Sequence, residues 1–231
     1  MFLNFITQYP FVLAFLVGLI PALVWLWFWL KEDLHPEPAK MVTLSFLGGI
    51  LAVFIVLPLQ QFIYPYVVNM DVLSFTVFAT LEELVKFGIV YFIVLRNKTI
   101  DDEPVDNIIY LIISALGFVA LENTLFLMDP VRSGDILKTI ITGNMRFIGA
   151  SLIHIISSGT IGIFMALSFY KNYLQRKIYL IMGIILAIIL HTSFNLLIIN
   201  SAERNILLIF GIVWIGIILL LLLFEKVKHL K

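Results

Sequence analysis

The sequence predicts an all-α membrane protein: a single integral membrane domain, residues 1–231, folded as a bundle of about seven transmembrane helices. Of the 231 residues, 61% are hydrophobic and only 13% are charged, and the mean hydropathy is +1.07. These values lie outside the range of soluble domains. Fifteen basic residues balance fifteen acidic ones, so no net charge attracts the chain to nucleic acid. Because cysteine is absent, disulfides and thiolate metal sites are excluded.

Seven stretches are long and apolar enough to cross a hydrocarbon core about 30 Å thick, which takes roughly 20 helical residues. Pro21 and Pro58 fall inside or at the end of two stretches, where neighbouring helices can satisfy the backbone groups that a kink releases. Residues 1–10 contain no Lys or Arg, so we expect the first stretch to be a permanent helix rather than a signal peptide. The expected spans are 11–30, 41–59, 72–95, 107–127, 147–169, 178–200 and 204–224.

The segment between the fourth and fifth spans differs from the rest. Residues 128–146, MDPVRSGDILKTIITGNMR, are too short and too charged to cross the membrane. Their pattern predicts an interfacial amphipathic helix near 130–146, or an outer loop. No internal repeat or low-complexity tract divides the chain, which favours one membrane domain.

The basic residues predict the orientation of the chain. With seven spans and the N-terminus outside, ten basic residues fall on the inner side and four on the outer side, and Lys86 stays within the membrane. The positive-inside rule therefore favours an outer N-terminus and a cytoplasmic C-terminus. The inner residues are Lys31, Lys40, Arg96, Lys98, Lys171, Arg176, Lys177, Lys226, Lys228 and Lys231. The outer residues are Arg132, Lys138, Arg146 and Arg204.

The third span carries three charges in an otherwise apolar stretch, FATLEELVKFGIVYF at 78–92. If Glu82, Glu83 and Lys86 all faced lipid, they would cost roughly 8 to 10 kcal/mol in total. Helical spacing places Lys86 at i+4 and i+3 from the two glutamates, so the three share one face, which we expect to point inward. A structural ion pair with a protonated second glutamate would have the same pattern.

Polar residues also occur in the next three spans. Counted at 1.5 Å per residue from each span's midpoint, the glutamates and both histidines fall between the midplane and about 7 Å from it on the outer side. A lone membrane histidine is more often a helix–helix hydrogen bond than a ligand, but two histidines at the depth of three carboxylates indicate a site. The residues are Glu122, Asn123, His154, Ser158, His191 and Asn195.

Carboxylates and imidazoles at one depth are the groups needed to hydrolyse an amide inside a membrane. A glutamate can act as general base on water, and a histidine or a metal ion can polarise that water or the carbonyl. The N–H of Asn195 can stabilise the oxyanion.

The motifs LEELVKF, GFVALENTLF, HIISSG and HTSFN, in this order on successive spans, resemble those of PrsW-type intramembrane proteases. The segment LKEDLHPEPAKM is similar to the acidic, proline-bearing loop of that family. The related CAAX prenyl protease and Abi superfamily has an arginine after its paired glutamates, so Lys86 favours the PrsW branch. The resemblance implies a bacterial cell-membrane protease that makes a site-1-type cut in a membrane-anchored protein, such as an anti-sigma factor.

The resemblance also implies roles for individual residues. Glu82 and Glu83 would be the catalytic pair, His154 and His191 ligands or electrophiles, and Asn195 the oxyanion partner. A divalent metal such as zinc would take His154, His191 and a carboxylate, for which Glu122 is the candidate. The sequence lacks a His-Glu-x-x-His helix, and a metal-free glutamate mechanism needs the same residues. Supporting roles fall to Lys86, Glu122, Asn123, Ser158 and Arg146.

Simpler roles stay open for three of the supporting residues. Arg146 begins a span, where a side chain that extends to the outer interface is the simpler expectation. Asn123 and Ser158 suit interhelical hydrogen bonds.

Other classes of membrane protein fit the sequence less well than a protease. A proton-coupled transporter could use the same residue types, but no repeated half or pair of interrupted helices is visible. A retinal protein would need a lysine midway along the last span, and 204–224 has none. A non-enzymatic scaffold or immunity protein would keep its activity without Glu82.

Overall fold

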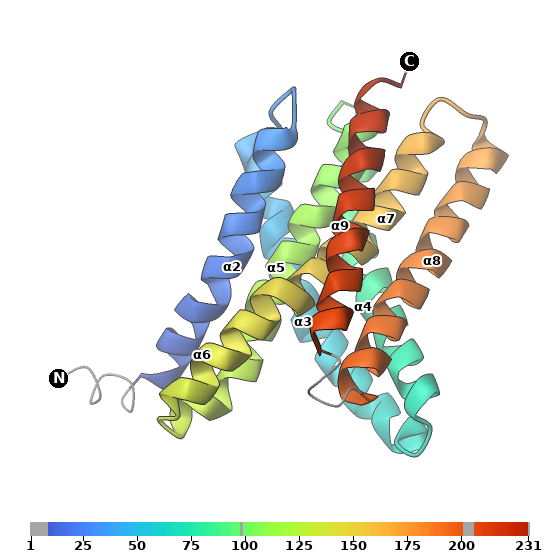
Figure 1. Cartoon of the computed structure of the whole chain (residues 1–231). Helices are drawn as coiled ribbons and strands as arrows, with labels where there is room; N and C mark the ends of the chain where they lie inside the picture. The colour runs from blue at the N-terminus through green and yellow to red at the C-terminus, as the bar shows by residue number, and fades with distance from the viewer. Residues whose placement is uncertain (1–8, 98, 201–205, 231) are drawn as a thin grey trace.

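The computed structural model describes residues 9–97, 99–200 and 206–230, and these contain helices and no strand (Figure 1). The predicted all-α membrane bundle is therefore confirmed. The helices are α2 (Pro10–Glu32), α3 (Ala39–Val67), α4 (Asp71–Val90), α5 (Pro104–Arg132), α6 (Ile136–Met145), α7 (Ser151–Leu167), α8 (Tyr173–Asn200) and α9 (Ile206–Lys228). Two π-helical turns continue α4 and precede α7: η1 (Tyr91–Leu95) and η2 (Arg146–Ala150).

Six helical stretches of the described chain are long and apolar enough to cross a membrane. The remaining long helix, α4, is set apart by its three buried charges and packs against α3 and α8. Together they make seven passes, so α2 begins at one end of the bundle and α9 finishes at the other (Figure 1). The start of the last predicted span, at 204, lies outside the described residues, and the rest of that span falls on α9.

The helix α5 forms the centre of the bundle. It packs against α2, α3 and α7, and 78% of its apolar stretch is buried, against 17% for α2. Its start is specified by a capping box in which Glu103 and Asp106 exchange side-chain to backbone hydrogen bonds, with Pro104 in the first turn. The polar residues in the C-terminal half of α5 therefore lie among neighbouring helices rather than against lipid.

Two glycines let α3 and α5 touch. A Cβ atom at Gly49 would lie 1.9 Å from the carbonyl oxygen of Ser114, and one at Gly117 would lie 1.9 Å from that of Phe46. Small residues at a membrane helix interface allow backbones to approach this closely. A side chain at either position would push the two helices apart.

The connection from α5 to α7 differs in detail from the prediction. The helix α5 continues through Pro130 to Arg132 and stops at Gly134, whose φ of 67° suits a left-handed helix end. The expected interfacial helix is present as α6, which starts only at Ile136 and has no buried residue. It runs through η2 into α7 without a break, so the predicted helix and the fifth span form one continuous stretch, 136–167.

Candidate active site

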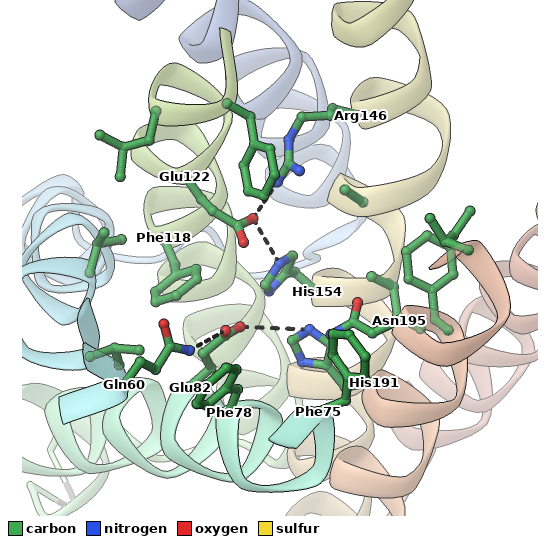
Figure 2. A pocket seen from close by; sticks show the side chains of 18 of the residues that line it. Gln60, Phe75, Phe78, Glu82, Phe118, Glu122, Arg146, His154, His191 and Asn195 are labelled. Carbon is green, nitrogen blue, oxygen red and sulfur yellow. Dashed lines mark hydrogen bonds and ion pairs between the residues drawn. The ribbon is translucent and has the colours of Figure 1, made fainter. Parts of the chain in front are cut away.

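A cavity of about 500 Å³ lies among α3, α4, α5, α7 and α8, in the half of the bundle nearest the α3–α4 turn. Most of its wall is apolar and aromatic, with Phe75, Phe78, Phe126 and Phe194 among the lining residues. Figure 2 shows the polar side chains that point into it from α3, α4, α5, η2, α7 and α8. An apolar cavity with a few converging polar groups is the usual form of a binding or active site.

Glu82, His154 and His191 form the central group of this cavity. Each side chain offers one ligand atom, and the three atoms lie within 4.8 Å of one another. Nε2 of His191 is 3.6 Å from Oε2 of Glu82, and the two imidazole rings are 4.7 Å apart and nearly perpendicular. All three residues are buried, at 8%, 2% and 2% exposure. The sequence predicted that these residues share one depth in the membrane, and the structure places their side chains close together.

Gln60 of α3 completes the surroundings of Glu82. Its amide donates a 2.9 Å hydrogen bond to Oε1 of Glu82 (Figure 2), while the buried Oε2 has no hydrogen-bond partner among the described residues. Sequence reasoning missed Gln60. The available signal was an amide pair, Gln60 and Gln61, that begins two residues after Pro58 in an apolar span.

Glu83 faces away from the cavity into the helix bundle. It is fully buried, and its carboxylate accepts hydrogen bonds from Lys86 Nζ at 2.7 Å and Ser158 Oγ at 2.8 Å. Nδ1 of His191 lies 2.8 Å from Oε1 of the same carboxylate. With a proton on Nδ1, the imidazole donates to Glu83 and turns Nε2 toward Glu82, which is how a second carboxylate usually orients a ligating histidine.

Lys86 lies between Glu83 and His154. Its ammonium group is fully buried, 3.2 Å from Nδ1 of His154 and 5.2 Å from the centre of the Phe118 ring. The ion pair with Glu83 balances its charge. The three charges of the opening motif in α4 therefore have different partners: Glu82 faces the cavity, and Glu83 and Lys86 form a buried ion pair behind it.

Glu122 and Arg146 line the other wall of the cavity. The guanidinium of Arg146 donates to Oε2 of Glu122 and to Oδ1 of Asn123, and it stacks 3.9 Å from the Phe126 ring centre. Nε2 of His154 lies 3.2 Å from the same Glu122 oxygen (Figure 2). The sequence favoured an interfacial Arg146. In the structure its side chain is 14% exposed and points inward, because η2 turns it toward the α5 carboxylate.

The remaining predicted residues have distinct places. Asn195 lies on the cavity wall beside His191, one helical turn further along α8 (Figure 2). Asn123 donates to Ser151 at 3.4 Å, and Ser158 donates to Glu83, so both make the interhelical hydrogen bonds expected of them. The carboxylate grouped with the two histidines is Glu82 rather than Glu122, the third ligand that the sequence suggested.

The central group fits a divalent metal ion. Two imidazoles and one carboxylate are a common ligand set of catalytic zinc, which keeps one further position open for water or substrate. The buried Oε2 of Glu82, which has no hydrogen-bond partner in the described part of the chain, is the kind of atom that a cation would satisfy. The second carboxylate on His191 supplies the orienting contact that ligating histidines have.

Fold and site together define a polytopic membrane protein with a nitrogen and oxygen ligand group inside an intramembrane cavity. The profile of the PrsW family of intramembrane metalloproteases matches residues 37–223. The chain therefore belongs to this family of intramembrane proteases, as the motif resemblance predicted.

Three relatives bear the name protease PrsW. The chain is 37% identical to that of Geobacillus kaustophilus over 114 residues, which are 48% of this chain and 50% of the relative. It is 28% identical to that of Clostridioides difficile over 204 residues, 84% and 83% of the two chains. It is 24% identical to that of Halalkalibacterium halodurans over 184 residues, 77% and 80% of the two chains. No solved structure matches the chain.

Proposed function

We propose that this chain hydrolyses a peptide bond in the membrane segment of a membrane-anchored protein, in the manner of a site-1-type cut in an anti-sigma factor. The observation that supports the proposal is the group of Glu82, His154 and His191 inside a cavity of the helix bundle. We further propose that the cavity opens toward the outer side of a bacterial cell membrane, with the C-terminus in the cytoplasm. The ten-to-four division of basic residues supports this orientation.

Glu82, His154 and His191 would hold the metal that the family description implies, and zinc suits their donor atoms. When bound, a divalent metal acts as a Lewis acid toward water or the scissile carbonyl. Gln60 fixes the Glu82 carboxylate through Oε1, and Glu83 fixes the ring of His191 through Nδ1. These two contacts leave Oε2 of Glu82 and Nε2 of His191 directed at each other across 3.6 Å.

Glu122 is the second carboxylate on the cavity wall and has the position needed for proton transfer. It forms an ion pair with Arg146, and an ionised carboxylate can accept a proton. In the proposed reaction, Glu122 takes a proton from water as the water oxygen bonds to the scissile carbonyl carbon. It returns that proton to the amide nitrogen as the carbon–nitrogen bond breaks. The side-chain N–H of Asn195, which lines the cavity from α8, donates to the developing oxyanion.

The apolar wall of the cavity suits a hydrophobic substrate segment. Phe75, Phe78 and Phe194 can contact the side chains of a transmembrane sequence, while the polar group lies beneath them. A peptide bond in an intact helix has its carbonyl hydrogen-bonded to the helix and shielded. The substrate must therefore be locally unwound where it meets Glu82.

A reconstituted cleavage assay tests this function. Glu82→Gln keeps the shape of the side chain and is expected to abolish turnover, while Glu225→Gln, the same change at an exposed residue of α9, is expected to leave it intact. Removing divalent metal with a chelator should also stop cleavage, and zinc should restore it in the Glu225→Gln protein but not in the Glu82→Gln protein. Cleavage at the wild-type rate by Glu82→Gln would refute the proposed site.

A further inference from the structure

A second cavity, of about 490 Å³, lies at the opposite end of the bundle from the active site. It is bounded by η1, the C-terminal end of α7, the first turn of α8 and the segments between them (Figure 1). Four basic side chains line it, and we refer to it as the basic cavity: Arg96, Lys171, Arg176 and Lys177. Two tyrosines, Tyr91 and Tyr173, add phenolic hydroxyls to the same wall.

The charge of the basic cavity is not balanced from within. Among the described residues, no ion pair joins any of the four cations to a carboxylate. Three of them make long contacts with aromatic rings: Arg96 lies 5.8 Å from the Phe92 ring, Lys171 lies 5.7 Å from the Tyr179 ring and Arg176 lies 5.7 Å from the Phe169 ring. Asp101 is the carboxylate that lines the same wall, so the lining carries four positive charges against one negative. Such a cavity favours an anion.

Apolar side chains continue from the basic cavity along the outside of the bundle. On α8, Leu174, Ile178 and Ile181 are 65%, 47% and 48% exposed, and on η1 Phe92 is 64% exposed. The three α8 residues belong to a helix that is long and apolar enough to cross a membrane, so we expect their exposed surface to face acyl chains rather than water. A ligand seated here would meet cations and hydroxyls with its head and a hydrocarbon-facing surface with its tail.

We infer that the basic cavity binds the headgroup of an anionic phospholipid, such as phosphatidylglycerol. Arg96, Lys171, Arg176 and Lys177 contact the phosphate, and Tyr91 and Tyr173 donate to headgroup oxygens. Basic pockets between helices at the cytoplasmic face are a recognised form of lipid site. A soluble phosphate shares this chemistry, but the adjoining hydrocarbon-facing surface favours the lipid. The inference is independent of the proteolytic function, because no residue of the cavity belongs to the active site.

Native mass spectrometry of the full chain in detergent micelles tests the inference. The protein is titrated with dioleoylphosphatidylglycerol, and separately with dioleoylphosphatidylcholine, which has the same tails and a zwitterionic headgroup. We expect one molecule of the anionic lipid to bind at least roughly tenfold more tightly than phosphatidylcholine. The triple variant Arg96→Gln/Lys171→Gln/Arg176→Gln should weaken that binding on the order of 100-fold, since each basic residue contributes about fivefold.

A control variant with the same loss of charge distinguishes binding in the basic cavity from a general attraction of the anionic lipid to basic residues. Lys31→Gln/Lys40→Gln/Lys226→Gln removes three exposed cations that the sequence places at the same end, and it should leave binding nearly unchanged. If the triple cavity variant does not purify as a folded protein, the single change Lys177→Gln should still weaken binding about fivefold. Equal binding of both lipids, an equal loss in the control, or displacement of the lipid by millimolar glycerol phosphate would overturn the inference.

Discussion

Glu83 offers the sharpest test of how the buried charges are organised. Its carboxylate and the ammonium group of Lys86 are 2.7 Å apart and almost completely buried. In Glu83→Gln, the buried ammonium group of Lys86 loses the carboxylate that balances its charge. Removing one partner of a buried ion pair costs about 3 to 5 kcal/mol, because the other charge is left uncompensated. We therefore expect Glu83→Gln to lower stability strongly as well as activity.

A double variant separates the two effects. In Glu83→Gln/Lys86→Met both charges are gone, and replacing a whole buried ion pair by neutral groups is often close to neutral in stability. Most of the lost stability should return. The carboxylate that orients His191 is still missing, however, so activity should stay about 10 to 100-fold below wild type, the usual effect of losing such a contact.

Thermal unfolding in detergent, followed by the fluorescence of the four tryptophans, measures the stability. On the scale of soluble domains of this size, 3 to 5 kcal/mol corresponds to a fall of roughly 6 to 20 °C in the melting temperature. A melting temperature for Glu83→Gln within a few degrees of wild type would show that Lys86 is not left as an unpaired buried cation. Recovery of full activity in the double variant would remove Glu83 from the positioning of His191.

Three further predictions concern Gln60 beside Glu82, Glu37 in the segment between α2 and α3 at the other end of the bundle, and the position of the cut. Gln60→Ala should lower kcat about tenfold with little change in melting temperature, because it frees the Glu82 carboxylate without removing a charge; a loss confined to KM would contradict this role. Burial raises the pKa of Glu37. Its protonated form therefore stabilises the fold below about pH 4.3, and that contribution is lost as the pH rises through the raised pKa. As the pH rises through this range, the melting temperature of Glu37→Gln should fall less than that of wild type. Mass spectrometry of the cleavage products should place the cut in the outer half of the substrate's membrane segment, and a cut on its cytoplasmic flank would refute the proposed orientation.

Helical spacing was enough to predict that Glu82, Glu83 and Lys86 share an inward face, and all three are buried. It could not separate their roles. Two adjacent residues lie about 100° apart on a helix, and only the packing of α7 and α8 decides which glutamate meets Ser158 and which meets the cavity. Gln60 was not predicted for a related reason, because two neighbouring amides in an apolar span, Gln60 and Gln61, form no periodic pattern.

The ends of helices near the membrane surface also could not be predicted from the sequence. The charges of residues 128–146 suggested that the fourth span stops near residue 127, yet α5 runs on through Pro130 to Arg132. A proline inside a membrane helix is tolerated where neighbouring groups satisfy the freed backbone. The signal that does mark the end is Gly134, which takes the positive φ that other residues adopt only with strain.

The glycine contact between α3 and α5 has a consequence for how a substrate reaches the site. A transmembrane segment can approach Glu82 from the lipid only if helices around the cavity separate. Gly49 and Gly117 hold the backbones of α3 and α5 too close for either helix to slide or rotate freely past the other. These two walls, with Gln60 on one and Glu122 on the other, therefore act as a rigid frame. We therefore expect any movement that admits a substrate to occur in the opposite wall, formed by the C-terminal end of α8 and the first turns of α9.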